Sequence, residues 1–437
     1  MEALHFEKQA VSHLFRKAES LAKQDGPLTP ETYHYVISES LKNWLGKQPW
    51  SWADGSPPPR PWRCGQSLTQ YCRRLAQVLR HLDHDWKLLC RFAEHDPGPL
   101  QRLDCQGDPH DGGQMVMSAV FQTRWRVLMK PRSLQADFCF QNLLDILQDS
   151  KGDENLRTPR VIQRPGANWG WVEFIPSASQ EPRPLRTRFL RQAGGLLSLL
   201  ECLQTIDCHV ENILVDRLGN ALPIDLECLF HPRLPSPKSA ATKAEILQVT
   251  LLPWPGSRRA FGELSSLGGR VRTPEDLQEV TAGYEQMVRL LLQKRQHLLS
   301  ENGWLEQSRN VPVRVVLRST VTYAELLRKL DSQPSPRQAR EFAARYLQKL
   351  SAGKPHLARV IPHEVDSLVA GDIPRFFSPR ADSRELRIGR NSLPDCWETP
   401  GWNAARDRLQ ALSENDLQEK LQMIRSCWKE LSNSPAA

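Results

Sequence analysis

The stretch Asp207-Cys208-His209-Val210-Glu211-Asn212, followed by Ile224-Asp225-Leu226-Glu227, decides which fold we expect of this chain. It reads Asp-x-His-x-x-Asn, then an apolar run, a Gly219-Asn220 turn, and a second apolar run that ends in Asp-x-Glu. Apolar runs on both sides of a glycine turn predict a β-hairpin. Such a hairpin folds Asp225 back beside Asn212.

This order of polar groups suits phosphoryl transfer. The reaction needs a residue that orients a hydroxyl group, and oxygen ligands that hold Mg²⁺ on the phosphates of ATP. Because Mg²⁺ prefers a few carboxylate or carbonyl oxygens beside substrate phosphates, we predict that Asn212 and Asp225 supply them. The alternative is structural, with Asp207 and His209 only capping and tying a loop.

The composition is that of an ordinary soluble globular protein, with 40% hydrophobic and 25% charged residues. A length of 437 residues allows two or three domains, or one kinase-like fold with extensions. No apolar run has the length of a membrane span, and residues 1–7 lack the apolar core of a signal peptide. We therefore expect a cytoplasmic protein without a membrane span.

The net charge of +8 suggests an anionic partner, but the basic residues are dispersed. The densest cluster is Arg183, Arg186, Arg188 and Arg191, which fits ATP or an acidic peptide as well as nucleic acid. No recognisable nucleic-acid motif accompanies it, and we expect no nucleic-acid partner. The ten cysteines show no metal-ligand spacing, which favours reduced thiols.

The hydrophobic pattern changes along the chain. Helical periodicity marks the first hundred residues, at positions 6–15 and 68–79, with a loop or linker rich in Pro and Trp at 48–65. Strands at 115–121 and 125–129, a helix at 135–149, a strand at 169–175 and a helix at 185–203 then lead into Asp207. Beyond residue 275 the pattern is mostly helical, with proline-rich connections at 332–336 and 372–379.

This order predicts an α+β fold with a two-lobed kinase-like core and helical N-terminal and C-terminal extensions. The expected division is a helical region at 1–104, the ATP-binding and catalytic core at 105–260, and a mainly helical region at 261–437.

Two weaker motifs precede the Asp207 stretch. Residues 107–113 form a glycine-rich turn whose backbone N–H groups could approach phosphates closely, although an ordinary hairpin loop explains it as well. Lys130 ends the next strand, where it could neutralise phosphate charge, or could simply extend from the strand end into water.

A further basic pair lies downstream. Arg314 and Arg318 would share one side of a helix, or would share one face of a strand with Val316. The alternative is a solvated basic face.

Seven motifs in order support one family resemblance. They stand at 107–112, 130–134, 170–174, 207–212, 224–230, 314–323 and 371–376. Together they resemble the dehydratase domain of class II lanthipeptide synthetases, the LanM type. The resemblance implies a fold related to lipid kinases and a two-step reaction on a ribosomally made precursor peptide. ATP phosphorylates a Ser or Thr side chain, and elimination of the phosphate then leaves dehydroalanine or dehydrobutyrine.

The resemblance also implies roles for individual residues. Asp207 and His209 would orient the substrate hydroxyl or relay its proton, with Glu227 alongside, and Arg314 and Thr320 would act in elimination. The remaining assignments concern ATP and Mg²⁺: Asn212 and Asp225 as metal ligands, Asp108 and His110 in the phosphate loop, and Lys130, Gly107, Gly112, Arg132 and Glu173 around ATP.

Full-length synthetases of this type continue into a zinc-dependent cyclase, whose Cys and His pattern is not found at Cys396 or Cys427. We therefore expect ring closure to need a separate cyclase, if it happens at all. The region before Gly107 is shorter than in the family, which leaves leader-peptide recognition without a predicted site. Two rival functions are a peptide or small-molecule kinase without elimination, and a non-catalytic precursor-binding partner.

Overall fold

The computed structural model describes residues 12, 16, 20, 27–29, 33–46, 61–110, 114–148, 155–176, 183–234, 245–252, 271, 273–352, 355–389 and 391–432. The chain forms two compact units, each built from segments that are distant in sequence. Unit 1 comprises Met1–Ser133, Arg164–Phe174 and Leu317–Arg375. Unit 2 comprises Leu134–Gln163, Ile175–Val316 and Phe376–Ala437. The division at residues 104 and 260 stays a prediction, while the mixture of helices and antiparallel sheets confirms the α+β class.

An antiparallel sheet forms the centre of unit 1. Its strands pair in the order β1 (Leu100–His110), β2 (Gln114–Phe121), β3 (Arg126–Lys130) and β5 (Gly170–Glu173). The predicted pairing of 115–121 with 125–129 is confirmed, with Met117 opposite Met129, and so is the strand expected at 169–175. Both methionines are fully buried, which fixes the register because a slip by one residue would turn them to the other face.

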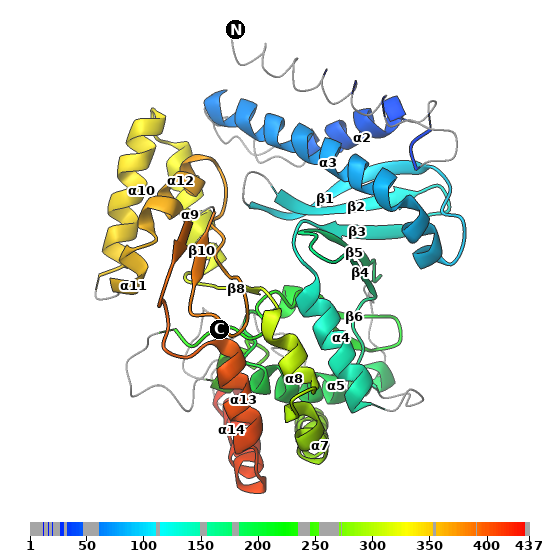
Figure 1. The fold of residues 1–437 in the computed structure, drawn as a ribbon, viewed down its shortest axis with the longest axis vertical. Coiled ribbons are helices and arrows are strands. Elements are labelled where there is room, and N and C mark those ends of the chain that lie inside the picture. Colours follow the sequence, from blue (N-terminus) through cyan, green and yellow to red (C-terminus); the bar gives the residue numbers. More distant parts are fainter. Residues whose placement is uncertain are drawn as a thin grey trace. The chain divides into compact units, whose positions relative to one another are not determined.

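Two helices accompany this sheet (Figure 1). They are α2 (Tyr33–Gly46), which packs on β1, and α3 (Pro61–Ala93), which confirms the helical period expected at 68–79. The loop expected at 48–65 is wrong for its last five positions, because α3 already begins at Pro61. Proline favours the first turn of a helix, where its missing N–H costs nothing. The helical prediction for 6–15 and the remainder of the loop lie outside the described residues, apart from Ser12.

Strand β1 corrects a second expectation, since its first residues lie in a region that was predicted to be helical. Leu100 and Leu103 are buried opposite Phe121 and Ala119, whereas Gln101 and Arg102 are exposed. This edge strand carries few apolar residues, so its own sequence does not indicate a strand. It becomes extended because it pairs with β2.

Unit 1 also contains a group of helices with its own apolar core. The group consists of α9 (Thr320–Asp331), α10 (Pro336–Leu350) and α12 (Ile361–Val369), and the short helix α11 (Pro355–Ala358) lies between α10 and α12 in the chain. The predicted connection at 332–336 is confirmed, because Ser335 caps α10 by accepting the Gln338 N–H and Pro336 occupies the first turn. The connection expected at 372–379 follows α12 and contains the short strand β9.

Unit 2 is built around two long helices, α5 (Arg183–Cys202) and α7 (Pro274–Leu299), which pack closely together. The contact depends on glycine: a Cβ atom on Gly194 would lie 2.0 Å from the Val280 carbonyl oxygen, and one on Gly283 would lie 1.8 Å from that of Arg191. Helix α4 (Gln135–Leu147) and helix α5 confirm the helices expected at 135–149 and 185–203. Any larger residue at either glycine would force the helices apart.

The densest basic cluster of the sequence belongs to this helix pair. Arg186 forms an ion pair with Asp276, and Arg191 donates from Nε to Glu279 over 2.8 Å. Acidic side chains of α7 therefore neutralise two of the four arginines of this cluster.

The predicted hairpin is confirmed in unit 2. Strands β6 (Ile213–Val215) and β7 (Ala221–Pro223) pair antiparallel. Gly219 at the turn has φ +78°, a region that glycine adopts without strain. The Asp216 carboxylate accepts the N–H groups of Leu218 and Asn220, both at 2.9 Å, which holds the turn closed.

The last part of unit 2 combines helices with a sheet that the sequence did not predict. The sheet has the order β11-β10-β9-β8. Its strands are β8 (Val313–Arg314), β9 (Phe377–Ser378), β10 (Leu386–Ile388) and β11 (Asn391–Leu393). Strands of two or three residues are too short to show an alternating pattern. The other elements of the unit are β4 (Val161–Gln163), α6 (Glu245–Gln248), α8 (Trp304–Gln307), α13 (Gly401–Ala411) and α14 (Glu414–Ser432).

A buried group of charges connects α5 to the C-terminal helices. The Glu201 side chain is fully buried and accepts hydrogen bonds from Arg408 Nε at 3.0 Å, Arg408 Nη2 at 3.1 Å and Tyr284 OH at 3.0 Å. Lys420 Nζ lies 2.9 Å from the same carboxylate. Burial alone would raise the Glu201 pKa, but the two cations outweigh it and lower the pKa below its usual value.

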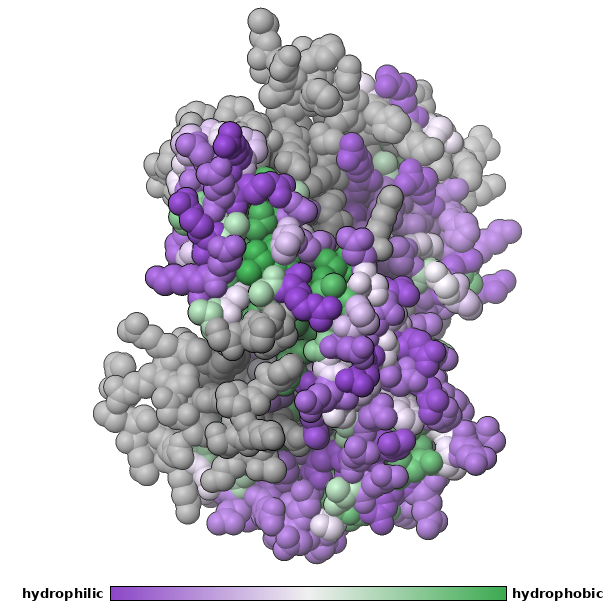
Figure 2. Space-filling view, turned by 60° about the vertical axis from the view of Figure 1, so that its left-hand side comes forward, coloured by the Kyte–Doolittle hydropathy of each residue, from purple (hydrophilic) through white to green (hydrophobic). Residues whose placement is uncertain are grey.

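On the face shown in Figure 2, the described residues are mostly hydrophilic, with small apolar areas. No helix in the described residues combines the length and the hydropathy needed to cross a lipid bilayer. The described cysteines are free thiols, as expected.

Candidate functional site

The loop that carries Asp207 begins where α5 ends. It runs into the 3-10 turn η1 (Val210–Asn212), which leads directly into β6. Asp207 has φ +67°, a left-handed conformation that non-glycine residues seldom adopt and that aspartate tolerates better than most. The next residue, Cys208, donates its N–H to the Val249 carbonyl over 3.0 Å and is buried. The backbone thus holds the Asp207 side chain in a fixed, uncommon position.

His209 lies between Asp207 and Asn212. Its Nδ1 accepts the Glu211 N–H at 3.3 Å, so the ring proton of the neutral imidazole is assigned to Nε2. That Nε2 lies 3.6 Å from Asp207 Oδ1 and 3.3 Å from Asn212 Nδ2. His209 therefore does cap η1, as the structural interpretation of the motif expects, but its other nitrogen faces the Asp207 carboxylate.

Asn212 and Asp225 come together through the hairpin, as expected. The Ile224 N–H donates to the Asn212 carbonyl over 2.9 Å, which places Asp225 one residue beyond this contact. The Asn212 Nδ2 donates to the Asp207 carbonyl at 2.7 Å, so the amide oxygen is the end of the side chain that remains for a cation.

This donor set fits Mg²⁺ rather than a metal held by protein alone. Within the described residues, no group of three or more His, Cys, Asp or Glu side chains is arranged to hold a metal ion. One amide oxygen and one carboxylate are the kind of partial ligand set that Mg²⁺ completes with substrate phosphates and water.

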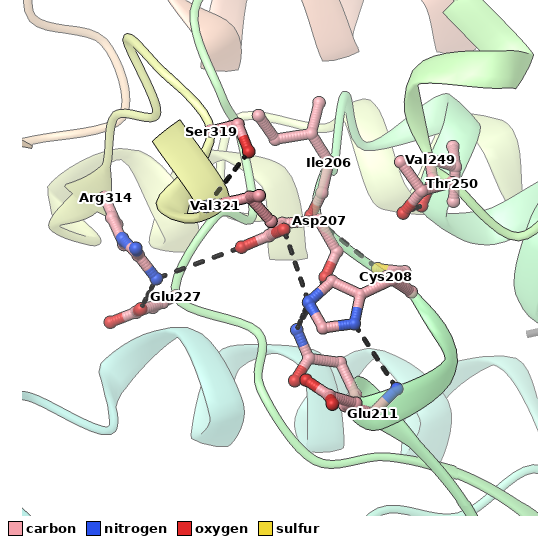
Figure 3. A network of polar contacts seen from close by, with 12 residues as sticks. Ile206, Asp207, Cys208, Glu211, Glu227, Val249, Thr250, Arg314, Ser319 and Val321 are labelled. Atoms are coloured by element: carbon pink, nitrogen blue, oxygen red, sulfur yellow. Dashed lines mark hydrogen bonds and ion pairs between the residues drawn. The ribbon is translucent and has the colours of Figure 1, made fainter. Parts of the chain in front are cut away.

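Arg314 reaches the site from strand β8, more than eighty residues further along the chain (Figure 3). Its Nη1 lies 2.5 Å from Glu227 Oε1 and 3.9 Å from Asp207 Oδ2. Its main-chain N–H also donates to the Glu227 carbonyl at 2.7 Å. Glu227 therefore holds both the backbone and the side chain of Arg314 beside the Asp207 carboxylate.

The charges of the site act on each other. Burial raises the pKa of Asp207 above its ordinary value, and the carboxylates Asp225 and Glu227 raise it further. Arg314 and His209 oppose this rise but do not reverse it. A carboxylate with a raised pKa binds a proton more readily, which suits a group that receives the proton of a hydroxyl.

Unit 2 thus gathers six of the predicted residues in one cluster. They are Asp207, His209, Asn212, Asp225, Glu227 and Arg314. We call this group the Asp207 cluster.

The other predicted residues belong to unit 1. Lys130 ends β3 opposite Gly170 and is buried, and Glu173 ends β5 opposite Val127. Arg132 is buried and donates from Nη1 to the Ser133 carbonyl at 2.9 Å. Thr320 is the first residue of α9. Gly107, Asp108 and His110 lie on β1, and Gly112 lies outside the described residues.

Arg318 has a different environment from the one we expected. Strand β8 ends at Arg314 and α9 begins at Thr320, so the two arginines share neither a helix nor a strand. The alternative of a solvated basic face is also wrong, because the Arg318 side chain is only 6% exposed. Its Nε donates to Glu364 Oε1 at 2.6 Å, and its Nη2 donates to Ser351 Oγ at 2.7 Å.

The partner Glu364 was missed in the sequence, although a signal for it was present. Helix α12 buries Ile361, Glu364, Val365 and Leu368. These positions follow the spacing of one apolar face, on which a carboxylate is out of place unless it is paired. Tyr323 OH completes the arrangement by donating to Glu364 Oε1 at 2.6 Å.

Two comparisons with known proteins bear on this site. The family described as "Domain of unknown function (DUF4135)" matches residues 63–278 and 263–378, a span that contains the whole Asp207 cluster. The Lacticin 481/lactococcin biosynthesis protein LcnDR2 of Lactococcus lactis subsp. lactis is 20% identical over 424 residues. The similarity covers 82% of this chain and 44% of the relative, so the chain spans less than half the length of that protein.

Proposed function

Since this chain belongs to the DUF4135 family, we propose that it is an ATP- and Mg²⁺-dependent dehydratase of lanthipeptide biosynthesis. Its substrates are Ser and Thr side chains of a ribosomally made precursor peptide. Two observations support this choice: a relative is named for the biosynthesis of lacticin 481, and the seven motifs of the dehydratase family are present in order. A kinase-like, two-lobed arrangement of the catalytic core is part of the proposal.

In the first half-reaction the peptide hydroxyl attacks the γ-phosphorus of ATP. A new O–P bond forms, the bond from the γ-phosphorus to the bridging oxygen breaks, and ADP leaves. Asp207 orients the hydroxyl and receives its proton, with His209 Nε2 at 3.6 Å available to stabilise the carboxylate. Asn212 and Asp225 would hold Mg²⁺, which would neutralise charge on the phosphates, and Lys130 would contribute a further positive charge.

In the second half-reaction the phosphate leaves. The Cα–H bond and the Cβ–Oγ bond break, a Cα=Cβ double bond forms, and the α-proton passes to a base that we do not assign. Arg314 stabilises the charge that develops on the departing phosphate, because a guanidinium fork matches phosphate oxygens in geometry and charge. The family resemblance also assigns Thr320 to this elimination step.

A single observation carries the proposal. The carboxylate assigned to phosphoryl transfer and the arginine assigned to elimination lie 3.9 Å apart within one unit. Among the described residues, both carboxylate contacts of Arg314 run through Nη1, and neither Nε nor Nη2 makes a hydrogen bond to a described side chain. That edge of the guanidinium is therefore free of described partners and suited to a phosphate.

Two rival functions remain in view. A kinase that stops at the phosphoester would have no evident use for Arg314 beside Asp207. A non-catalytic partner that only binds the precursor would not need Asp207, Asn212 and Asp225 together.

Mass spectrometry of a candidate precursor peptide tests the proposal directly. The peptide is incubated with the protein, ATP and Mg²⁺, and a parallel sample omits ATP. The proposal expects the loss of one water mass for each reacting Ser or Thr, in the presence of ATP only. Retained phosphate on the peptide would instead identify a peptide kinase. Unchanged peptides across a panel of precursors, together with intact ATP binding, would favour the precursor-binding partner.

A further inference from the structure

His231 belongs to segment 227–231, which contacts residues 314–316, and the preceding sections give His231 itself no function. The segment is fixed to the end of α5, where the loop carrying Asp207 begins. The Phe230 N–H donates to the Leu203 carbonyl at 3.1 Å, and the His231 N–H donates to the Gln204 carbonyl at 3.0 Å. Gly401 also packs here so closely that a Cβ atom would lie 1.7 Å from the Phe230 carbonyl oxygen. Residues 230 and 231 therefore have little freedom to move.

The His231 ring makes one bond that reaches the Arg314 strand. Its Nε2 accepts the Val316 N–H at 3.1 Å. Two residues earlier, the Arg314 N–H donates to the Glu227 carbonyl at 2.7 Å, while the intervening Val315 N–H turns to the Phe376 carbonyl at 2.8 Å. The amides of 314 and 316 thus both point to segment 227–231, one to a carbonyl and the other to an imidazole.

The backbone explains why a side chain takes the second position. Phe230 has φ +60°, an uncommon conformation for an aromatic residue, and the chain turns there. The main chain of segment 227–231 therefore does not continue as a strand beside residues 314–316. The ring of His231 supplies the acceptor that a strand carbonyl would otherwise provide, and in this partly buried position an N–H without an acceptor would cost free energy.

The ring can accept this bond only while it is neutral. Burial lowers the pKa of His231 to about 4, and the positive charge of Arg314 lowers it further, against a backbone hydrogen bond at Pro232 that raises it. With Nε2 as the acceptor, the ring proton belongs to Nδ1. The side chain is thus held in one charge state and one tautomer, which is more than packing alone requires.

We propose that His231 is a positioning residue for Arg314. It holds the Val316 amide, completes the attachment of residues 314–316 to segment 227–231, and so keeps the guanidinium at Glu227 and beside Asp207. This role rests on the proposed function only in its consequence for elimination, since the positioning itself is a property of the fold. The simpler alternative is that the ring only fills space.

Two matched variants distinguish the effect of the hydrogen-bond acceptor at position 231 from the effect of side-chain volume. His231→Gln keeps a neutral acceptor near the position of Nε2, and His231→Leu has a similar volume without an acceptor. The first readout is hydrogen exchange of the segment around Val316, which needs no activity. His231→Leu is expected to exchange the Val316 amide about tenfold faster, the loss expected when one hydrogen bond is removed, whereas His231→Gln stays within about threefold of the wild type.

The second readout is the ratio of phosphorylated to dehydrated peptide. It is expected to rise about tenfold in His231→Leu and to return toward the wild-type ratio in His231→Gln. Unchanged exchange and an unchanged ratio in His231→Leu would overturn the proposal in favour of packing. Equal damage in both variants would do so too, because the acceptor would then not matter.

The test does not depend on the assigned reaction or on one variant folding. If the wild type dehydrates no peptide, the proposed function fails while hydrogen exchange still decides the positioning role. If His231→Leu does not fold, the wild type labelled with ¹⁵N-histidine gives the answer. A neutral ring with the proton on Nδ1 down to pH 5 supports the proposal, and a ring that titrates near pH 6.5 overturns it.

Discussion

Arg314 and Arg318 stand four positions apart in one motif, yet their surroundings differ in almost every respect. Arg318 donates to Glu364 through both Nε and Nη2, at 2.6 Å and 3.2 Å, and donates to Ser351 as well. Its carboxylate partner is fully buried. Arg314 contacts its carboxylates through Nη1 alone, and one of them, Asp207, is 32% exposed.

The difference shows how to distinguish a structural arginine from one that can act on a substrate. A buried pair with all its hydrogen bonds satisfied gains nothing from a new partner and suffers strongly when one member is lost. A guanidinium with one edge free of described partners, beside a carboxylate of raised pKa, can take a phosphate without first breaking its own bonds. Position within a motif therefore says less about function than the completeness of the pairing.

The largest effect should follow from a substitution in the Asp207 cluster, the region that contains Arg314. Asp225→Asn keeps the size of a metal ligand and removes its charge, so phosphorylation should fall by roughly 10³-fold or more. The rate is measured as phosphate transfer to peptide. Asp216→Asn, at the other end of the same hairpin, controls for the shape of the hairpin, since Asp216 accepts the N–H groups of Leu218 and Asn220 and lies 3.8 Å from Arg157. Equal loss of rate in both variants would contradict the role of Asp225.

A substitution in the buried Arg318–Glu364 pair should change the stability of the fold. Glu364→Gln leaves Arg318 buried without a countercharge, and the free energy of unfolding should drop by about 3–5 kcal/mol. Urea denaturation followed by fluorescence measures it. Arg337→Ala is the control, because that side chain is 89% exposed and its pair with Glu341 should contribute about 0.5 kcal/mol or less. A drop below about 1 kcal/mol for Glu364→Gln would mean that the buried pair is not what holds these helices.

Substitution of the two arginines themselves compares the regions directly. Arg314→Ala should slow elimination by about 10²–10³-fold and leave phosphorylated peptide, while phosphorylation persists. Arg318→Ala should lower both half-reactions together, through loss of folded protein. The two products are separated by mass, and Arg314→Lys reports whether the planar fork or only the charge is needed. If Arg314→Ala lost phosphorylation and elimination alike, the separate roles would be wrong.

The smallest effect concerns pH. Phosphorylation needs the ionised form of Asp207, whose pKa is raised by burial and held down in part by Arg314. Removing that cation raises the pKa further, so the acidic limb of the phosphorylation rate in Arg314→Ala should move to higher pH by roughly one unit. Rates of the first half-reaction between pH 4 and 8 show the shift. A limb that stayed in place, or moved to lower pH, would mean that Arg314 does not act on Asp207.

Much of the candidate site was predictable because its signals are local. The hairpin of β6 and β7 follows from the Gly219 turn between apolar runs, and this hairpin alone brings Asp225 to Asn212. Helix α5 follows from the helical spacing of its apolar residues. Lys130 was expected at a strand end because turn residues separate the apolar runs that form β3 and the neighbouring strand. In each case the residues that decide the outcome lie within a few positions of one another.

The elements that were missed depend on distant partners. Strand β1 carries few apolar residues and is ordered by β2. Strands β8 and β9 are each two residues long and depend on pairing, β8 with β9 and β9 also with β10. The environment of Arg318 depended on Glu364, which lies on the distant helix α12. His231 gave no signal at all, because its partner is a main-chain N–H of Val316, which no sequence pattern can display.

The sequence by itself determined the order of the catalytic groups, the hairpin that brings two of them together, and the mixed class of the fold. These depend on the spacing of apolar residues and on turn chemistry, which act over a few residues. Only the tertiary structure decided that Arg314 faces Asp207 while Arg318 is paired with the buried Glu364, and that His231 accepts the Val316 N–H. The physical reason is that a charged or polar side chain takes its role from the groups buried around it, and those groups come from segments that the chain brings together only when it folds.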